Sequence, residues 1–180
     1  MVGGILVLGP LPGTYRALPE NPVLKNATIL SITGNGKIVC AGGFEGIAMI
    51  FDSDSVNRNI AAPYKFRNLN DIDNIGTNYV YSIYKDTRNR IWFAMGEKGI
   101  YVLENNKFVH YGKENGLLDD RIFSITEDKK GNIWFNTKSA GIYSFNGKKF
   151  KNYSTASGLS DLEIISLKTG PWGNVIVVNR

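Results

Sequence analysis

The chain of 180 residues carries 21 Lys and Arg against 16 Asp and Glu, which gives a formal net charge of +5. These basic residues are spread along the chain and do not form the concentrated basic face that nucleic-acid binding needs. A single cysteine, Cys40, excludes an internal disulfide, and the lack of a run of about 20 apolar residues argues against a membrane-spanning helix.

The sequence repeats every 42 residues, which is the separation of Val80 from Ile122 and of Ile122 from Ile164. Residues 122–135 (IFSITEDKKGNIWF) echo residues 80–93 (VYSIYKDTRNRIWF). An aromatic, a branched aliphatic and a serine recur in fixed register: Tyr15, Phe66, Phe108, Phe150; Ile29, Val80, Ile122, Ile164; Ser31, Ser82, Ser124, Ser166. A fixed period in the low forties is typical of a β-propeller, in which each repeat forms one blade.

In chain order, the register divides the chain into a half blade, three whole blades and a second half blade. Their predicted bounds are 1–25, 26–76, 77–119, 120–161 and 162–180. The first whole blade contains eleven extra residues, because Gly46 and Phe66 lie 20 residues apart where the later copies have 9.

Each whole unit is predicted to form four short antiparallel strands. In the unit 120–161 these cover residues 121–127, 133–137, 142–145 and 149–153, and the pair Asn146-Gly147 predicts a tight hairpin turn. No segment shows a long helical period, so the predicted class is all-β. The half units leave two arrangements open: they pair to close a four-bladed ring, or the chain is a fragment of a larger propeller. The interrupted unit at Arg180 favours the fragment.

Four segments carry a family resemblance: Asn115–Asp119 (NGLLD), Ser157–Asp161 (SGLSD), Gly131–Phe135 (GNIWF) and Ala140–Tyr143 (AGIY). Together they resemble the two-component regulator propeller repeat. The flanking units depart from it, since Val39 and Ile176 replace the tryptophan and residues 73–75 replace Asn-Gly-Leu.

The resemblance implies a seven-bladed propeller in the extracytoplasmic half of a hybrid histidine kinase from Bacteroidetes-type bacteria. It implies a sensory module that responds to glycans, with an oligosaccharide and further blades of the parent chain as partners, no nucleic acid and no membrane contact by this segment. A periplasmic location follows from the resemblance alone, because the first ten residues lack the basic start and cleavage site of a signal peptide. The alternative is a structural protein-interaction propeller without a signalling role.

No residue is predicted to be catalytic or to hold a metal or cofactor, and the ligand-binding residues remain unknown. His110 is the sole histidine, and Cys40 lies in an apolar strand, so we interpret them as surface and core residues. The segment Asp71–Gly76 fails as a calcium loop at Ile75. The glycines at 34–36 and 42–46 match no nucleotide-binding pattern and are interpreted as hairpin glycines.

Three further features have two interpretations each. Trp92 and Trp134 recur at one repeat position, which favours inter-blade core over a sugar-stacking role. The extra residues around 52–63 form either a recognition loop or a tolerated surface loop. The basic group Lys148, Lys149 and Lys151 is interpreted as a solvated hairpin, with an anionic glycan site as the alternative.

Overall fold

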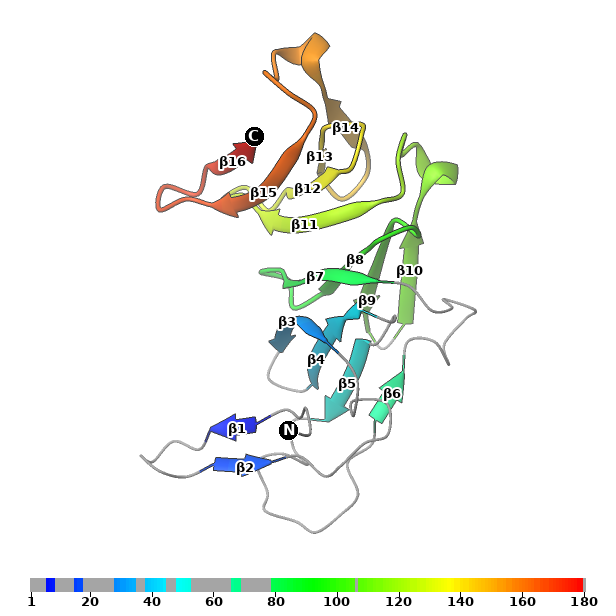
Figure 1. Cartoon of the computed structure of the whole chain (residues 1–180), viewed down its shortest axis with the longest axis vertical. Coiled ribbons are helices and arrows are strands. Elements are labelled where there is room, and N and C mark those ends of the chain that lie inside the picture. The colour runs from blue at the N-terminus through cyan, green and yellow to red at the C-terminus, as the bar shows by residue number, and fades with distance from the viewer. Residues whose placement is uncertain are drawn as a thin grey trace.

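The structure is a computed structural model that describes residues 6–8, 15–17, 28–34, 38–44, 48–52, 66–68, 79–105 and 107–179. In these ranges the chain forms short antiparallel strands, which confirms the predicted all-β class. Three sheets have four strands and two sheets have two strands. The sheets follow one another along the long axis of the molecule, from β1 (Leu6–Leu8) and β2 (Tyr15–Ala17) to β15 (Ile164–Thr169) and β16 (Val175–Asn179) (Figure 1).

Each four-stranded sheet is one blade whose strands lie side by side in chain order. The blades comprise β3 (Ile29–Gly34), β4 (Ile38–Gly43), β5 (Ala48–Asp52) and β6 (Phe66–Asn68); β7 (Val80–Lys85), β8 (Ile91–Met95), β9 (Ile100–Glu104) and β10 (Lys107–Tyr111); and β11 (Ile122–Glu127), β12 (Ile133–Thr137), β13 (Ile142–Phe145) and β14 (Phe150–Tyr153). The strand bounds predicted for the β11–β14 blade are confirmed to within one residue. Two 3-10 helices, Lys113–Asn115 and Thr155–Ser157, follow the outermost strands, and within the described ranges no helix has the length and apolarity to span a membrane.

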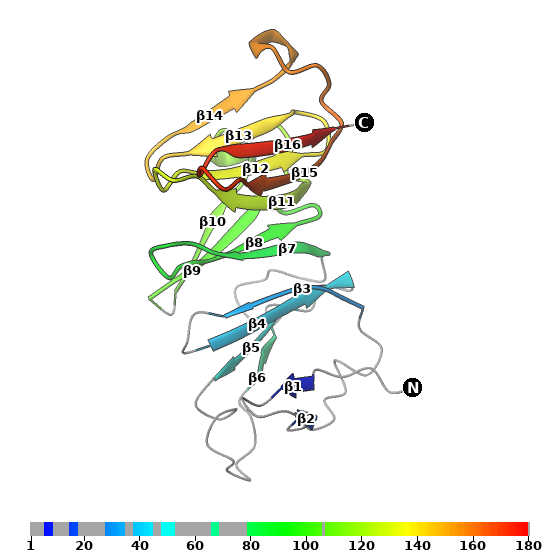
Figure 2. The same ribbon diagram turned by 90° about the vertical axis from the view of Figure 1, so that its left-hand side faces the viewer.

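The first strands of successive sheets, β3, β7, β11 and β15, lie next to one another in that order (Figure 2). Two of the repeated serines connect neighbouring first strands. The Ser31 hydroxyl accepts a hydrogen bond from the Ile83 N–H at 2.9 Å, and the Ser124 hydroxyl accepts one from the Leu167 N–H at 3.1 Å. At these two positions the repeated serine joins one sheet to the next.

The main hydrophobic core lies between the β7–β10 and β11–β14 blades. Trp92 is fully buried there and packs in one cluster with Ile125, Ile133 and Phe145 of the next blade. Burial of large aromatic side chains makes a large contribution to stability, since each removes roughly 150–250 Å² of its surface from water.

In the β7–β10 and β11–β14 blades an aspartate, buried at Asp86 and partly buried at Asp128, holds the turn between the first two strands. Asp86 accepts hydrogen bonds from the N–H groups of Arg88 and Arg90 and from the Trp92 indole at 2.8 Å. Asp128 makes the same set of bonds one repeat later, to Lys130, Asn132 and Trp134. These repeated residues build the scaffold.

The backbone conformation explains why a glycine recurs before the third strand. Gly99 and Gly141 have φ angles of 65° and 75°, in the left-handed region that favours glycine. A Cβ at Gly99 would also collide with the Tyr111 carbonyl oxygen, and one at Gly141 with that of Tyr153. The third strand therefore approaches the end of the fourth strand closely only because no side chain intervenes.

The two small sheets are complementary halves of a blade. In β1–β2, Leu8 pairs with Tyr15, as Leu103 pairs with Phe108 in β9–β10, so this hairpin corresponds to the two outer strands. In β15–β16, the pairing and its irregularity between Ile164 and Ser166 repeat those of β11–β12, so this hairpin corresponds to the two inner strands. The hairpins lie at opposite ends of the molecule as separate sheets, and the structure is thus not a closed four-bladed ring (Figures 1 and 2).

Candidate functional site

A row of aromatic side chains runs across the first strands. Tyr81 of β7 contacts Phe123 of β11, with ring centroids 4.9 Å apart. Tyr79 lies 6.0 Å from Tyr81, and Phe44 meets both tyrosines edge-on at 5.6 and 6.3 Å. Phe44 and Tyr79 are exposed, while Tyr81 and Phe123 are partly buried. We call these four residues the inner aromatic row.

The row extends in both directions along the first strands. Leu30 of β3 and Ile165 of β15 occupy the repeat position of Tyr81 and Phe123, and both are exposed. A core would bury side chains of this size, so an exposed apolar stripe over several blades is typical of a binding surface.

A polar cleft of about 290 Å³ lies where the chain enters β11. Its lining residues are Glu97, Lys113, Leu118, Asp119, Asp120, Arg121 and Ser139. Arg121 of this cleft precedes Phe123 of the inner aromatic row by two residues at the start of β11.

Two adjacent carboxylates in this cleft have different surroundings. Asp119 accepts hydrogen bonds from Arg121 Nε at 2.8 Å and from the Ser139 hydroxyl at 2.6 Å. Burial opposes its ionisation, but the hydrogen bonds from Arg121 and Ser139 outweigh burial and lower the pKa of Asp119 well below its ordinary value. In the part of the chain that the structure describes, Asp120 Oδ1 is buried without a hydrogen-bond partner. It is an acceptor available to a ligand.

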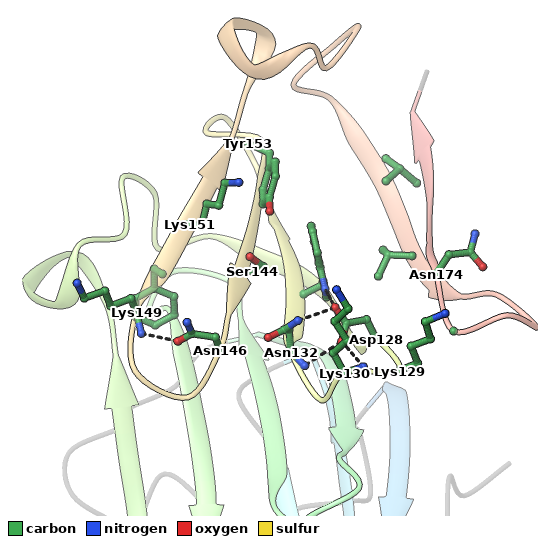
Figure 3. A pocket seen from close by; sticks show the side chains of 15 residues that line it. Asp128, Lys129, Lys130, Asn132, Ser144, Asn146, Lys149, Lys151, Tyr153 and Asn174 are labelled. Carbon is green, nitrogen blue, oxygen red and sulfur yellow. Dashed lines mark hydrogen bonds between the residues drawn. The ribbon is translucent and has the colours of Figure 1, made fainter.

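A second and larger cleft of about 740 Å³ separates the β11–β14 blade from β15–β16. Figure 3 shows Lys149, Lys151 and Tyr153 on its β13–β14 wall and Asn174 on the opposite wall. Trp134 lines the cleft as well. The equivalent face of the β7–β10 blade is covered by the β13–β14 hairpin, whose Phe145 packs on Trp92. The larger cleft therefore lies at the position where, one blade earlier, a pair of strands covers the tryptophan.

Two segments of the chain match a known family. Residues 74–97 and 116–139 match the two-component regulator propeller family. These two segments therefore have the sequence pattern of the two-component regulator propeller repeat. The second match covers residues 116–119 and the segment Gly131–Phe135, whereas Ala140–Tyr143 and Ser157–Asp161 lie outside both matches.

Solved structures share the fold of this propeller at low sequence identity. One is described as the extracellular domain of a hybrid two-component system from B. thetaiotaomicron (TM-score 0.74, 22% identity, 97% of this chain and 24% of that one). A second is described as the extracellular domain of a one-component system from the same organism (TM-score 0.63, 20% identity, 86% and 23%). A third is virginiamycin B lyase from Staphylococcus aureus (TM-score 0.66, 15% identity, 89% and 52%).

The propeller thus spans about a quarter of the length of the two extracellular domains. No curated protein matches it. At these identities the likeness shows the fold and leaves the ligand to be argued from the site.

The two repeated tryptophans are placed differently. Trp92 is fully buried between blades, which confirms its predicted role in the core. Trp134 is partly buried: it packs against Ile142, Ile164 and Leu167 on one side and lines the larger cleft on the other. Trp92 and Trp134 occupy the same repeat position but differ in burial, because the sheet next to Trp134 has two strands instead of four.

The structure does not bring Cys40 and His110 together as a pair. Cys40 lies in β4 within the core between the β3–β6 and β7–β10 blades. His110 lies in β10, where its ring nitrogens are 2.8 Å from the Lys98 carbonyl oxygen and 2.9 Å from Glu114 Oε1. The structure therefore confirms that Cys40 is a core residue and that His110 is a surface residue.

The Cys40 thiol is expected to be inert in the native propeller. Burial raises its pKa to about 12, so the reactive thiolate is scarce at neutral pH. We expect a thiol reagent such as DTNB to label Cys40 at least tenfold more slowly in buffer than in denaturing urea. Equal labelling rates would show that the core between the first two blades opens freely.

Several sequence features lie outside the described residues: the insertion beyond Asp52, the loop Asp71–Gly76, and parts of the two glycine-rich segments. Lys148 and Lys149 lie on the exposed turn between β13 and β14, as predicted. Sequence reasoning missed the inner aromatic row. A signal was present for two of its members, because the position between the repeated aliphatic and the repeated serine holds Leu30, Tyr81, Phe123 and Ile165 in successive repeats.

Proposed function

We propose that this propeller is the ligand-recognition module of a two-component regulator, that it acts outside the cytoplasm, and that its ligand is a glycan. The observation that carries the proposal is the inner aromatic row next to the polar cleft. The row crosses two blades, from Tyr81 on β7 to Phe123 on β11, and the cleft opens at the start of β11.

This combination suits a sugar chain. The C–H faces of a pyranose ring are apolar and pack on aromatic rings, while its hydroxyl groups need hydrogen-bond partners when they leave water. Tyr79 and Tyr81 offer both an aromatic face and a hydroxyl, and the unpaired Asp120 Oδ1 offers an acceptor. A row of rings several residues long favours an oligosaccharide over a single sugar.

The extracytoplasmic and signalling parts of the proposal rest on the family. The matched repeats belong to two-component regulators, and two structures of the same fold are described as extracellular domains of bacterial regulatory systems. In this proposal, binding of the ligand to the propeller alters the activity of a downstream protein.

We propose binding without catalysis. Cys40 is buried with a raised pKa, and His110 lies on a blade surface, where its ring nitrogens contact the Lys98 carbonyl oxygen and Glu114. The charged pair at the cleft, Asp119 and Arg121, is held in mutual hydrogen bonds and serves the fold.

Loss of the aromatic row is expected to abolish glycan binding while the propeller stays folded. The probe is an array of neutral and acidic oligosaccharides, followed by isothermal titration with the best binder. We expect Tyr81→Ala and Phe123→Ala each to weaken binding at least tenfold, which is about 1.4 kcal/mol, because each removes one stacking ring. Asp120→Asn is expected to weaken it less, since the amide keeps one acceptor oxygen.

Trp172→Ala is the matched control, because this tryptophan is 80% exposed and lies in the turn between β15 and β16, outside the row. It should bind the glycan as the unmodified chain does. The proposal fails if no oligosaccharide binds, or if the aromatic variants bind with unchanged affinity. A blank array together with capture of a purified partner protein would favour the protein-interaction alternative.

A further inference from the structure

A groove of about 470 Å³ lies between the β7–β10 and β11–β14 blades. One wall is formed by the end of β10 and the loop after it, and the other by the β13–β14 hairpin. Both walls belong to whole blades with four described strands each. The groove is separate from the inner aromatic row, which lies along the first strands. Its volume is within the range of roughly 300–1,000 Å³ that is usual for small-molecule sites.

Three aromatic side chains line this groove. Tyr111 and Phe150 are partly buried and meet edge-on, with ring centroids 5.5 Å apart. Phe145 is buried and stacks on Phe150 at 4.6 Å, while Tyr111 stacks on the buried Trp92. Because the core holds these rings in place, the groove offers a rigid aromatic surface to a ligand.

The charged side chains that line the groove are both basic. Lys148 and Lys149 reach it from the β13–β14 turn, and both are exposed. Neither lysine forms an ion pair with a described residue. Figure 3 shows the Lys149 side chain extending away from Asn174, and so away from the opposite wall of the larger cleft. Two ammonium groups are therefore available at the lip of the groove.

A third cation lies beside the same turn. A Cβ built on Gly147 would lie 3.8 Å from Arg88 Nη1, so the guanidinium of the preceding blade reaches the turn. No carboxylate lines the groove to offset these charges. Glu114, the nearest acidic residue in sequence to the opposite wall, lies 2.9 Å from His110 Nδ1. The electrostatic potential of the groove thus favours an anion.

Asn115 adds hydrogen-bond donors on the opposite wall. Its Oδ1 accepts the Gly112 N–H at 2.9 Å, which leaves its NH₂ group without a partner among the described residues. Asn115 is exposed, and a Cβ built on Gly116 would meet no atom within 4 Å. This wall is therefore open to a ligand that carries acceptor oxygens.

We propose that the groove binds a carboxylated sugar, the hexuronate unit of an acidic glycan. The apolar C–H face of the sugar would pack on Tyr111 and Phe150, and its carboxylate would lie within reach of the ammonium groups of Lys148 and Lys149. A neutral sugar would leave the ammonium groups unused, and an inorganic anion would leave the rings uncovered. The assignment does not depend on which ligand the inner aromatic row binds.

Titration of the isotope-labelled 180-residue chain with digalacturonate, followed through its amide NMR spectrum, tests the proposal. We expect the amide signals of Gly116 and Gly147 to shift. Lys148→Gln combined with Lys149→Gln should weaken binding at least about tenfold, because the pair of charges at the lip is lost. Lys148→Arg combined with Lys149→Arg keeps the charges and should retain binding.

Lys85→Gln combined with Lys130→Gln is the matched control. It removes the same net charge at two exposed positions outside the groove and should leave the affinity unchanged. Equal losses in the control and in the groove variant would show adhesion through net charge alone and would overturn the proposal. The amide spectrum also shows whether each variant is folded.

Neutral galactobiose and inorganic phosphate are the ligand controls, and each should bind the groove at least about tenfold more weakly than digalacturonate. Equal binding of either one overturns the assignment, as does digalacturonate that does not bind. Shifts confined to Tyr81 and Phe123 would overturn it as well, and would leave the glycan proposal for the inner aromatic row in place. Tyr81→Ala should not change the binding of digalacturonate at Gly116 and Gly147, and a change there would contradict two separate sites.

Discussion

Replacing Trp92 with alanine is expected to lower the free energy of unfolding by about 3–5 kcal/mol, the usual loss when a large aromatic site in a core is emptied. Trp92 is fully buried, stacks on Tyr111 with ring centroids 6.4 Å apart, and donates its indole N–H to Asp86. The substitution would remove these contacts and leave the Asp86 carboxylate with one donor fewer in the core. Urea denaturation followed by circular dichroism measures the loss.

Two tryptophans of the same chain provide matched controls. Trp134→Ala is expected to lower the free energy of unfolding by roughly half as much, because its side chain is partly exposed at the larger cleft. Trp172→Ala should stay within about 0.5 kcal/mol of the unmodified chain, as exposed positions do. An equal loss at Trp92 and Trp134 would contradict the difference in burial that the structure shows.

Replacing Asp119 with alanine is expected to lower the free energy of unfolding by about 2–3 kcal/mol at neutral pH, in the range for hydrogen bonds to a charged group. The carboxylate accepts hydrogen bonds from the backbone and side chain of both Arg121 and Ser139, at 2.6–3.1 Å. It thereby ties the segment before β11 to the turn after β12. The loss is measured by urea denaturation at pH 7.

The pH dependence distinguishes this ionised carboxylate from a neutral packing residue. Because the pKa of Asp119 is lowered on folding, its contribution is present above the ordinary aspartate pKa and is lost as pH falls toward the lower folded value. The unmodified chain should therefore lose stability below about pH 4, and Asp119→Ala should lose less over the same interval. Parallel curves for the two proteins would show that Asp119 does not ionise differently in the folded state.

The sequence predicted the blades well because their signals are local. A hairpin turn such as Asn146-Gly147, a repeated serine and a repeated glycine each lie within one unit, and the 42-residue period aligns them. The strands of the β11–β14 blade follow from these residues alone.

The candidate site could not be predicted in the same way. Tyr81 and Phe123 belong to different blades, and their ring contact depends on how closely β7 and β11 approach each other. The partial burial of Trp134 likewise depends on the number of strands in the neighbouring sheet. Even Asp119, which lies in a segment that resembles the family repeat, takes its role from Ser139, twenty residues away in sequence.

The hydroxyls of Ser31 and Ser124 accept hydrogen bonds from the next first strand, so one joint connects β3 to β7 and another connects β11 to β15. Each joint, such as that between Ser31 and Ile83, is a few atoms wide and lies along the inner strands. An oligosaccharide held across Tyr81 and Phe123 would bridge the neighbouring strands β7 and β11, which lie between these two joints. It would stiffen the angle between two blades, and a small change of angle at the inner strands becomes a larger displacement at the outer strands β10 and β14.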